Sequence, residues 1–463
     1  MGKTDENKRE QRYKLLTTGN LYPLLIRMAI PSMIGMIVST VYNMTDTYWV
    51  AKLDDAALTA SVGVVFTFVS VIQAIGFWFG YGSGNYISRM LGKKDNEKAE
   101  KMAAVGVCLA IITGIIFLLI GLILINPLSV LLGAGNDEVL LDATIKYLRI
   151  TVFSVPFMLV SNVLYNQLRL SGGAGSSMIG LLLGMGVNMI LDPLFILSFN
   201  MGIEGAAYAS LIGQVIGVAV LFYGTYKPGN VKVDLRKAKP DMFHIKEILA
   251  GGAPNFCRQG ISSISSVVLN NVAGGFSVNA LAAITIATRV LYIAYALVIG
   301  FGQGFQPVCA MNYGAKNYDR IKKAFKLTLI TVTVFLVIST LVLILMKTSL
   351  IGSFTNEDEV ALLAGNMLEK WCMILPFMGY YILIGMLLQN IGRFALATSV
   401  TTLENGFCLI PVLLICGLVM GEDGLLWFKP IASGISLIIS IFIGTYAWRK
   451  YLGGEKNAVC NTI

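Results

Sequence analysis

The chain is dominated by long apolar segments that short polar connectors separate. A helix needs about 20 mostly apolar residues to cross the hydrocarbon core of a bilayer. Twelve windows of that length can be placed along the 463 residues, which are 56% hydrophobic and only 13% charged. We therefore predict an all-α polytopic membrane protein with twelve transmembrane helices. The windows lie near residues 22–48, 57–82, 102–125, 142–166, 177–199, 205–226, 247–273, 279–305, 326–346, 361–388, 395–419 and 425–448.

The basic residues gather in alternate connectors, and this pattern predicts the orientation of the chain. A formal net charge of +9 would suggest a nucleic-acid partner for a soluble protein, but here Lys and Arg cluster before Leu21, in 89–101 and in 227–246. Such loops face the cytoplasm, whereas the opposite connectors carry acids such as Glu204. We expect a bacterial plasma-membrane protein with both termini cytoplasmic, no nucleic-acid partner, and no signal peptide, because the first apolar segment is too long.

The second half of the chain repeats the first. Pro31 returns as Pro254, Gly80-Tyr-Gly-Ser-Gly84 as Gly302-Gln-Gly304, and Gly202 with Gly205 as Gly421 with Gly424, at an offset that drifts from about 223 to 219. Each half holds six helices, so both halves enter the membrane from the same side and form parallel repeats. We predict an N-terminal lobe at 1–226, a basic cytoplasmic linker at 227–246 and a C-terminal lobe at 247–463.

The fifth window contains a carboxylate within an apolar run. Asn188 and Asp192 are four residues apart, so on a helix their side chains share one face and can offer oxygens to one small cation or proton. Pro193 follows, and its ring frees carbonyls about one turn earlier. An ionisable residue inside a membrane indicates a functional site. The alternative is an acid neutralised against a neighbouring helix for structural reasons.

These features together resemble the multidrug and toxic compound extrusion (MATE) family, whose pattern includes Pro31 followed by Tyr42 and Asp46 on the first helix. The segments "AALTASVGV", "LRLSGGAGSSM" and "GIEGAAYAS" are similar to recurring segments of that family. The resemblance implies a V-shaped pair of lobes and an antiporter that exports organic cations or xenobiotics in exchange for H⁺ or Na⁺. It also implies the site residues, with Pro31 as the hinge and the coupling ion bound by Asp46, Asn188, Asp192 and Ser210 beside Tyr42. If the ion is Na⁺, its metal ligands would be Asp46, Asn188 and Asp192.

The expected depths of the two acids agree with a shared site. Both helices enter from the cytoplasm, so Asp46 and Asp192 fall in the outer half of the membrane. Two close carboxylates in a low dielectric cannot both stay charged without a proton or a cation between them. Asp46 has an alternative role as an interfacial cap beside an aromatic belt of Tyr48 and Trp49. Carboxylate, amide and hydroxyl oxygens suit both ions, so the sequence leaves H⁺ and Na⁺ open and predicts no other cofactor.

The C-terminal half departs from part of the family, because no acid follows Pro254 by two turns. Arg258 and Glu404 are interpreted as the internal charges of this half, which must meet each other or face water. If Glu404 faces the cavity, it attracts a cationic substrate, and Arg258 and Asn162 are further candidates for lining that cavity. The alternative is a structural pair between Arg258 and Glu404.

Other classes of function lack the residues they need. No GxxxxGK[ST] motif is present, which argues against ATP as the driving force, and no enzyme is expected. The seven cysteines show no CxxC spacing and predict neither disulfides nor a zinc site. A lipid-linked saccharide flippase of the same superfamily is the alternative, but it would need a cationic groove, and Arg258, Arg289 and Lys370 are few and scattered. We expect a monomer that acts on small organic cations.

Overall fold

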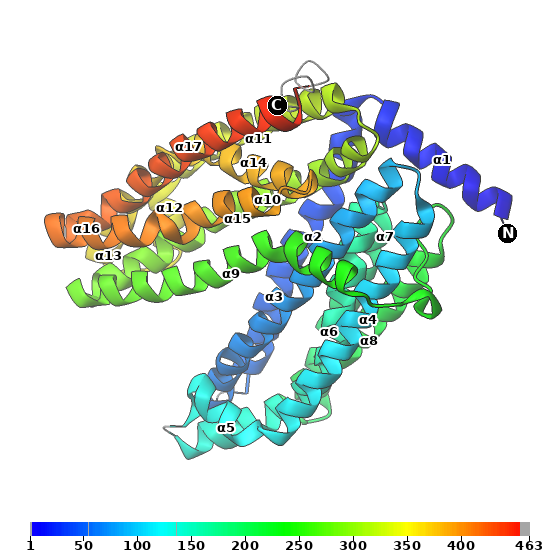
Figure 1. The fold of residues 1–463 in the computed structure, drawn as a ribbon. Helices are drawn as coiled ribbons and strands as arrows, with labels where there is room; N and C mark the ends of the chain where they lie inside the picture. The colour runs from blue at the N-terminus through cyan, green and yellow to red at the C-terminus, as the bar shows by residue number, and fades with distance from the viewer. Residues whose placement is uncertain (1, 54, 136, 454–463) are drawn as a thin grey trace. The chain divides into compact units, whose positions relative to one another are not determined.

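The computed structural model describes residues 2–53, 55–135 and 137–453, and within these ranges it is helical without strands (Figure 1). Each of the twelve predicted windows lies almost wholly in one helix or in two or three consecutive helical segments. The N-terminal set is α1 (Gly2–Thr18), α2 (Leu21–Ala51), α3 (Ala56–Gly92), α4 (Asn96–Ile123), α5 (Ile125–Ser129), α6 (Glu138–Leu170), α7 (Ala174–Pro193) and α8 (Gly202–Tyr226). The C-terminal set is α9 (Met242–Phe276), α10 (Val278–Gly314), α11 (Tyr318–Leu345), α12 (Lys347–Gly352), α13 (Asp358–Cys372), α14 (Met378–Asn390), α15 (Phe394–Thr402), α16 (Leu409–Met420) and α17 (Gly424–Tyr451).

Length and hydropathy alone identify nine of the described helical runs as long enough to cross a membrane, or ten with the bent pair Asp358–Cys372 and Leu375–Asn390. The difference from twelve has two causes. The run Phe394–Tyr451 has 58 residues and contains two predicted windows, which are separated at Gly421, where φ is +61°. The other cause is α9, which is long enough at 35 residues but carries Arg258 and a series of serines.

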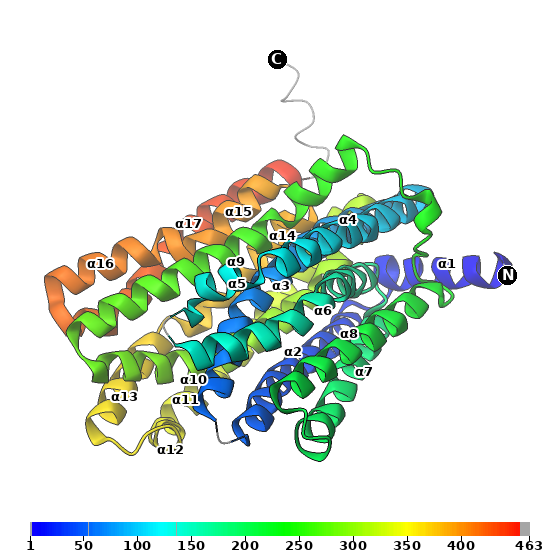
Figure 2. The same ribbon diagram turned by 90° about the horizontal axis from the view of Figure 1, so that it is seen from below.

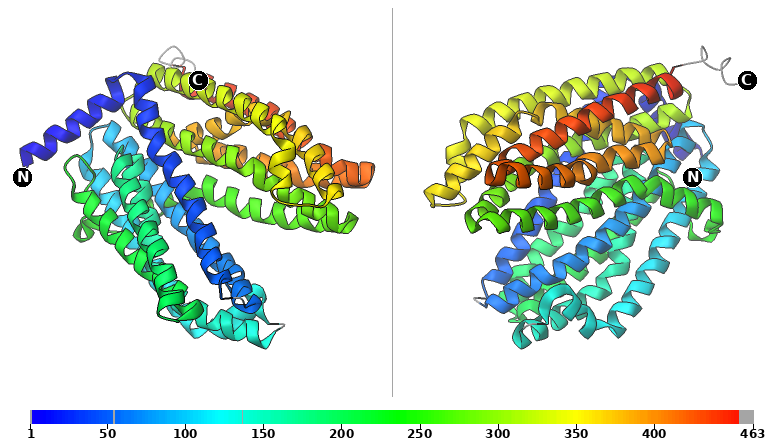
Figure 3. Two further views of the ribbon diagram at one scale, coloured as in Figure 1. Left: turned by 180° about the vertical axis from the view of Figure 1, so that it is seen from behind. Right: turned by 60° about the vertical axis from the view of Figure 1, so that its left-hand side comes forward.

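The described chain divides into two compact units. Unit 1 comprises residues 1–18 and 34–252, and unit 2 comprises residues 19–33 and 253–463. In unit 1, α6 packs against α3, α4, α7 and α8. The most apolar stretch of α6 is 67% buried, against 22% for the run that begins with α7, so α6 is the central helix of this unit (Figure 2). In unit 2, α10 packs against α11, α13 and α14, and α17 packs against α13, α14 and α16 (Figure 3).

The units do not divide at the predicted linker, because two helices are shared between them. The first turns of α2 belong to unit 2 up to Met33, and the first turns of α9 belong to unit 1 up to Gly252. These turns pack against glycines of α10 and α3, two helices that occupy matching places in the repeat. A Cβ at Gly304 would lie 2.5 Å from the backbone N of Ala29, and a Cβ at Gly82 would lie 1.9 Å from the carbonyl O of Ile248. The repeated glycines thus permit backbone contacts that any side chain would block.

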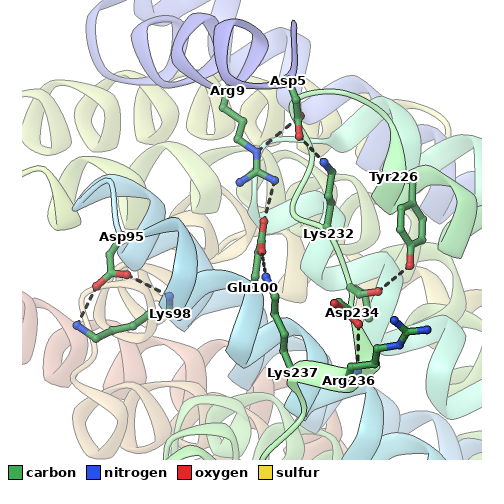
Figure 4. Close-up of polar contacts among 11 residues, drawn as sticks. Asp5, Arg9, Asp95, Lys98, Glu100, Tyr226, Lys232, Asp234, Arg236 and Lys237 are labelled. Atoms are coloured by element: carbon green, nitrogen blue, oxygen red, sulfur yellow. Dashed lines mark hydrogen bonds and ion pairs between the residues drawn. The ribbon is translucent and has the colours of Figure 1, made fainter. Parts of the chain in front are cut away.

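Ion pairs hold α1 and the stretch 227–246 within unit 1 (Figure 4). Asp5 pairs with Lys232 at 2.7 Å and accepts a hydrogen bond of 2.8 Å from the backbone N–H of Gly229. Glu100 of α4 accepts from Arg9 at 2.9 Å and pairs with Lys237 at 2.8 Å. Burial alone would raise the pKa of Asp5, but the hydrogen bonds from Lys232 and Gly229 outweigh it and hold this pKa below its ordinary value. The predicted linker is therefore part of a packed unit.

Candidate functional site

The polar pair on α7 lies against α8. The side-chain amide of Asn188 donates to Ser210 Oγ at 3.1 Å and to Asp192 Oδ1 at 3.3 Å. Asn188 is 1% exposed and Asp192 is 0% exposed. Glycines allow α7 and α8 to lie this close together, because a Cβ on Gly184 would lie 3.0 Å from the Gly213 carbonyl O. The four-residue spacing and the close helix contact together bring three oxygen-bearing side chains to one point.

α2 brings Tyr42 and Asp46 to the same point, in the part of that helix that belongs to unit 1. The side chains of Tyr42 and Ser210 are hydrogen-bonded, and Asp46 lies within electrostatic range of both Tyr42 and Asp192. The structure therefore brings together all five residues that the resemblance assigned to coupling-ion binding. Which ion these residues bind stays a prediction.

Tyr147 also faces this group, and the sequence interpretation missed it. It is a buried residue of α6 and lies within electrostatic range of Asp46, Tyr42 and Asp192. Nothing in the sequence marks it, because a tyrosine on the central helix of a bundle is most often ordinary packing. We refer to Tyr42, Asp46, Tyr147, Asn188, Asp192 and Ser210 as the N-terminal polar site.

Three oxygens of this site lack partners among the described residues. They are Asp46 Oδ1, Asn188 Oδ1 and Asp192 Oδ2, and each is buried. A buried acceptor without a donor is costly, so such groups are normally hydrogen-bonded or bound to an ion. Protons or a hard cation such as Na⁺ would satisfy these oxygens, which are the ligand type that hard cations prefer. The described residues contain no cluster of three or more His, Cys, Asp or Glu side chains that could hold a metal ion, so a cation at this site would have two carboxylates with amide and hydroxyl oxygens as ligands. The donor set thus fits H⁺ or Na⁺.

The polar residues of unit 2 include one that the prediction omitted. Arg258 Nη1 donates to the Tyr295 hydroxyl at 3.2 Å. Glu404 lies near the Tyr381 hydroxyl and within electrostatic range of Lys429 of α17 and of Arg258. Lys429 is thus a further charge near Glu404 that the sequence interpretation did not include. The signal was available, because Lys429 is a charged residue inside the predicted window 425–448. Whether Glu404 and Arg258 line a substrate cavity or form a structural pair stays a prediction.

Two further candidates lie away from these polar groups. The side-chain amide of Asn162 on α6 donates to the Met158 carbonyl at 2.9 Å, and a Cβ at Gly76 would meet Asn162 at 2.8 Å, so Asn162 packs at the contact between α6 and α3. Its place in a substrate cavity stays a prediction. Pro31 lies inside α2, which continues as a helix on both sides of it, and the hinge at Pro31 stays a prediction as well.

Comparison with known proteins identifies the family. The MatE family model matches residues 31–194 and 254–415, two stretches that begin at the repeated prolines Pro31 and Pro254. The chain belongs to the MatE family. The N-terminal polar site lies in the first matched stretch except for Ser210, and Arg258, Tyr381 and Glu404 lie in the second.

Relatives of this MatE protein cover nearly its whole length. It is 28% identical over 426 residues to the multidrug export protein MepA of Staphylococcus aureus strain MSSA476, with 91% of this chain and 93% of MepA covered. It is 27% identical to the MepA protein of Staphylococcus haemolyticus, with 94% and 96% covered. Among solved structures, an outward-facing multidrug resistance MATE family transporter matches with a TM-score of 0.87 at 25% identity, covering 95% of this chain and 98% of that one. A Pyrococcus furiosus transporter of the same superfamily, described as having a binding pocket of reverse polarity, matches with a TM-score of 0.86 at 25% identity and the same coverage.

Proposed function

We propose that this MatE protein is a secondary active antiporter that exports small organic cations and other xenobiotics in exchange for H⁺ or Na⁺. The observation that carries the proposal is that two carboxylates, an amide and a hydroxyl lie together in the N-terminal polar site, where Asp46 Oδ1, Asn188 Oδ1 and Asp192 Oδ2 are buried without partners among the described residues. The names of the staphylococcal relatives, which are multidrug export proteins, support the direction and the breadth of transport.

The N-terminal polar site can exchange one ion for a substrate only if its ion affinity differs between the inward-facing and outward-facing states. Asp46 and Asp192 come from different helices, so a small movement of α2 changes the distance between their carboxylates. Close carboxylates hold a cation tightly, and separated carboxylates release it. In this proposal a bend at Pro31 moves Asp46, while Asn188 keeps Asp192 fixed against α8.

We also propose a membrane location and an orientation for the protein. We place it in the bacterial plasma membrane, with both termini and the basic residues 227–246 in the cytoplasm, because Lys and Arg concentrate in cytoplasmic loops. The two halves of the repeat are on one chain, so a monomer contains both of the units that such a transporter needs.

The test is efflux of a fluorescent organic cation from proteoliposomes under imposed H⁺ or Na⁺ gradients. Asp192→Asn keeps the size of the side chain and one oxygen but removes the titratable charge, so it should abolish gradient-driven efflux while the protein still folds and binds the organic cation. Asp46→Asn should have the same effect. The double variant should be no worse than either single variant, because both residues belong to one site.

A matched control is Asp142→Asn, because the Asp142 side chain is 64% exposed and pairs with Lys146 at the surface. This variant should transport as the wild type does. Wild-type efflux by purified Asp192→Asn protein would refute the assignment of the N-terminal polar site as the coupling site. The gradient that drives wild-type efflux identifies the coupling ion.

A further inference from the structure

Four residues at the end of α17 and in the turn before α15 form a compact group of aromatic and basic side chains. The guanidinium carbon of Arg393 lies 3.9 Å from the centre of the Tyr451 ring. Lys450 Nζ donates to the Tyr446 hydroxyl at 2.7 Å and lies 5.7 Å from the centre of the Tyr451 ring. The rings of Tyr446 and Tyr451 meet edge to face, with their centres 6.3 Å apart. We refer to Arg393, Tyr446, Lys450 and Tyr451 as the α17 end group.

The two basic side chains of the α17 end group can still donate to a ligand. Arg393 and Lys450 are exposed, and neither forms an ion pair with a carboxylate in the part of the chain that the structure describes. A guanidinium that stacks on a ring uses only its face, so its N–H groups stay in the plane, where they match the oxygens of a phosphate. Lys450 uses one of its three N–H groups on Tyr446 and adds a second positive charge. The α17 end group is therefore suited to an anion with several oxygens.

The matching end of unit 1 is covered and neutralised by its own chain. Tyr226 ends α8, and its hydroxyl donates to the Val233 carbonyl at 3.0 Å in the stretch that follows. A basic residue of that stretch, Lys232, pairs with Asp5 of α1 at 2.7 Å. The last helix of unit 2 thus ends in two exposed positive charges that no described acid neutralises, whereas charges at the same end of unit 1 have acidic partners.

An exposed apolar stripe along α17 leads to this group. Its residues are between 40% and 72% exposed, and their spacing of three or four places them on one face of the helix: Ile431, Ile435, Ile438, Phe442 and Tyr446. The stripe is about 22 Å long. One leaflet contributes only about 15 Å to the hydrocarbon core. The stripe therefore offers an acyl chain a continuous apolar surface that ends at the α17 end group.

We propose that the α17 end group binds the phosphate of an anionic phospholipid, with Arg393 and Lys450 on the phosphate oxygens and an acyl chain along the stripe of α17. The position along the helix supports a lipid, because the predicted window 425–448 ends between the two tyrosines, and tyrosines gather where a membrane meets water. Basic residues at that depth attract anionic lipids. The two positive charges repel the cationic group of a zwitterionic phospholipid, so the site selects for a net negative headgroup.

The experiment compares two phospholipids on the purified full-length protein in detergent. Phosphatidylglycerol or phosphatidylcholine is titrated, and bound lipid is counted by native mass spectrometry. One basic residue near a membrane surface strengthens binding of an anionic lipid about fivefold. The wild type should therefore prefer phosphatidylglycerol for its first bound lipid by roughly 25-fold. Arg393→Gln and Lys450→Gln should each lower this preference about fivefold, and the double variant should bind both lipids equally within about twofold.

The matched control is Lys322→Gln, because Lys322 is a basic residue of the same unit whose charge is paired with Asp319 at 3.1 Å. This variant should keep the wild-type preference. Arg393→Lys keeps the charge and should retain most of it, and the unfolding midpoint in phosphatidylcholine alone shows that each variant is folded.

Two results would overturn the inference. One is equal affinity of the wild type for the two lipids, a comparison that depends on no variant, and the other is an unchanged preference in the folded double variant. Inorganic phosphate in excess should not displace phosphatidylglycerol, because phosphate has no acyl chain to lie along α17. Displacement by inorganic phosphate would show that the group holds a free anion and not a lipid, and it would overturn the inference as well.

Discussion

The contact between α3 and the first turns of α9 predicts that Gly82→Ala destabilises the protein. The added Cβ would lie 1.9 Å from the Ile248 carbonyl O, whereas ordinary contacts of this kind begin at 3.4 Å. The first turns of α9 must therefore move away from α3 by about 1.5 Å. This movement strains the hydrogen bond of 2.7 Å from Trp78 Nε1 to the Leu249 carbonyl O and the ion pair between Arg89 and Glu247.

The magnitude follows from these contacts. Overpacking a closely packed interior costs about 1–3 kcal/mol, and the weakened hydrogen bond adds about 1 kcal/mol. The greater helix propensity of alanine offsets about 1 kcal/mol of this. We expect Gly82→Ala to lower the free energy of unfolding by about 1–3 kcal/mol. This loss should appear as a lower midpoint in thermal unfolding of the detergent-solubilised protein.

Gly63→Ala is the matched control, because it lies on the same helix and its Cβ would meet no described atom within 4 Å. This variant should be as stable as the wild type or gain up to about 1 kcal/mol. Equal midpoints for Gly82→Ala and Gly63→Ala would refute the close approach of α9 to α3. Gly304→Ala should resemble Gly82→Ala, since its Cβ would lie 2.5 Å from the Ala29 backbone N.

Three further predictions concern the surface, the topology and the site. Burial alone would raise the pKa of Glu100, but hydrogen bonds from its two basic partners hold it below its ordinary value of 4.5. The contribution of the ionised Glu100 side chain to the free energy of unfolding is therefore complete above pH 4.5, and it is lost as the pH falls through the lowered pKa. Glu100→Gln should cost about 1–3 kcal/mol at pH 7 in chemical unfolding, with the difference from wild type closing in acid, whereas exposed Glu97→Gln should cost nothing measurable. Single cysteines at Glu204 should react with an impermeant thiol reagent from outside and those at Lys94 only after permeabilisation, and the reverse would refute the orientation. Tyr147→Phe should weaken ion binding by up to about tenfold without lowering the unfolding midpoint, and unchanged affinity would exclude its hydroxyl from the site.

Hydropathy found the helices because the length of an apolar run is a direct physical requirement for crossing a bilayer. It placed their ends less well. α3 continues to Gly92 and α10 to Gly314, about ten residues beyond the predicted windows, because polar residues such as Asn85 and Asn312 are buried within the protein and hydropathy does not register them. The helix α1 was not expected, since the ion pairs that hold it join Arg9 to Glu100 and Asp5 to Lys232 across long stretches of sequence.

Only some residues of the N-terminal polar site could be predicted from local sequence, because the others come from distant helices. Asn188 and Asp192 could be paired from their spacing alone, because an interval of four residues on a helix defines one face. Asp46 and Ser210 came from family resemblance, since no local pattern says which helices are neighbours. Tyr147 gave no signal at all.

The sharing of α2 and α9 between the units has a consequence for how the chain can be divided. A fragment that ends at residue 226 would contain Gly82 but not the turns Met242–Gly252 that fill the space beside it, and a fragment that begins at residue 227 would lack the turns that contact Gly304. Each half would leave a bare helical groove beside its glycine. A half-length ancestor with this architecture could have closed both grooves only as a pair of identical chains that exchanged the opening turns of their first helices. The gene fusion that joined such a pair would have made the exchange permanent.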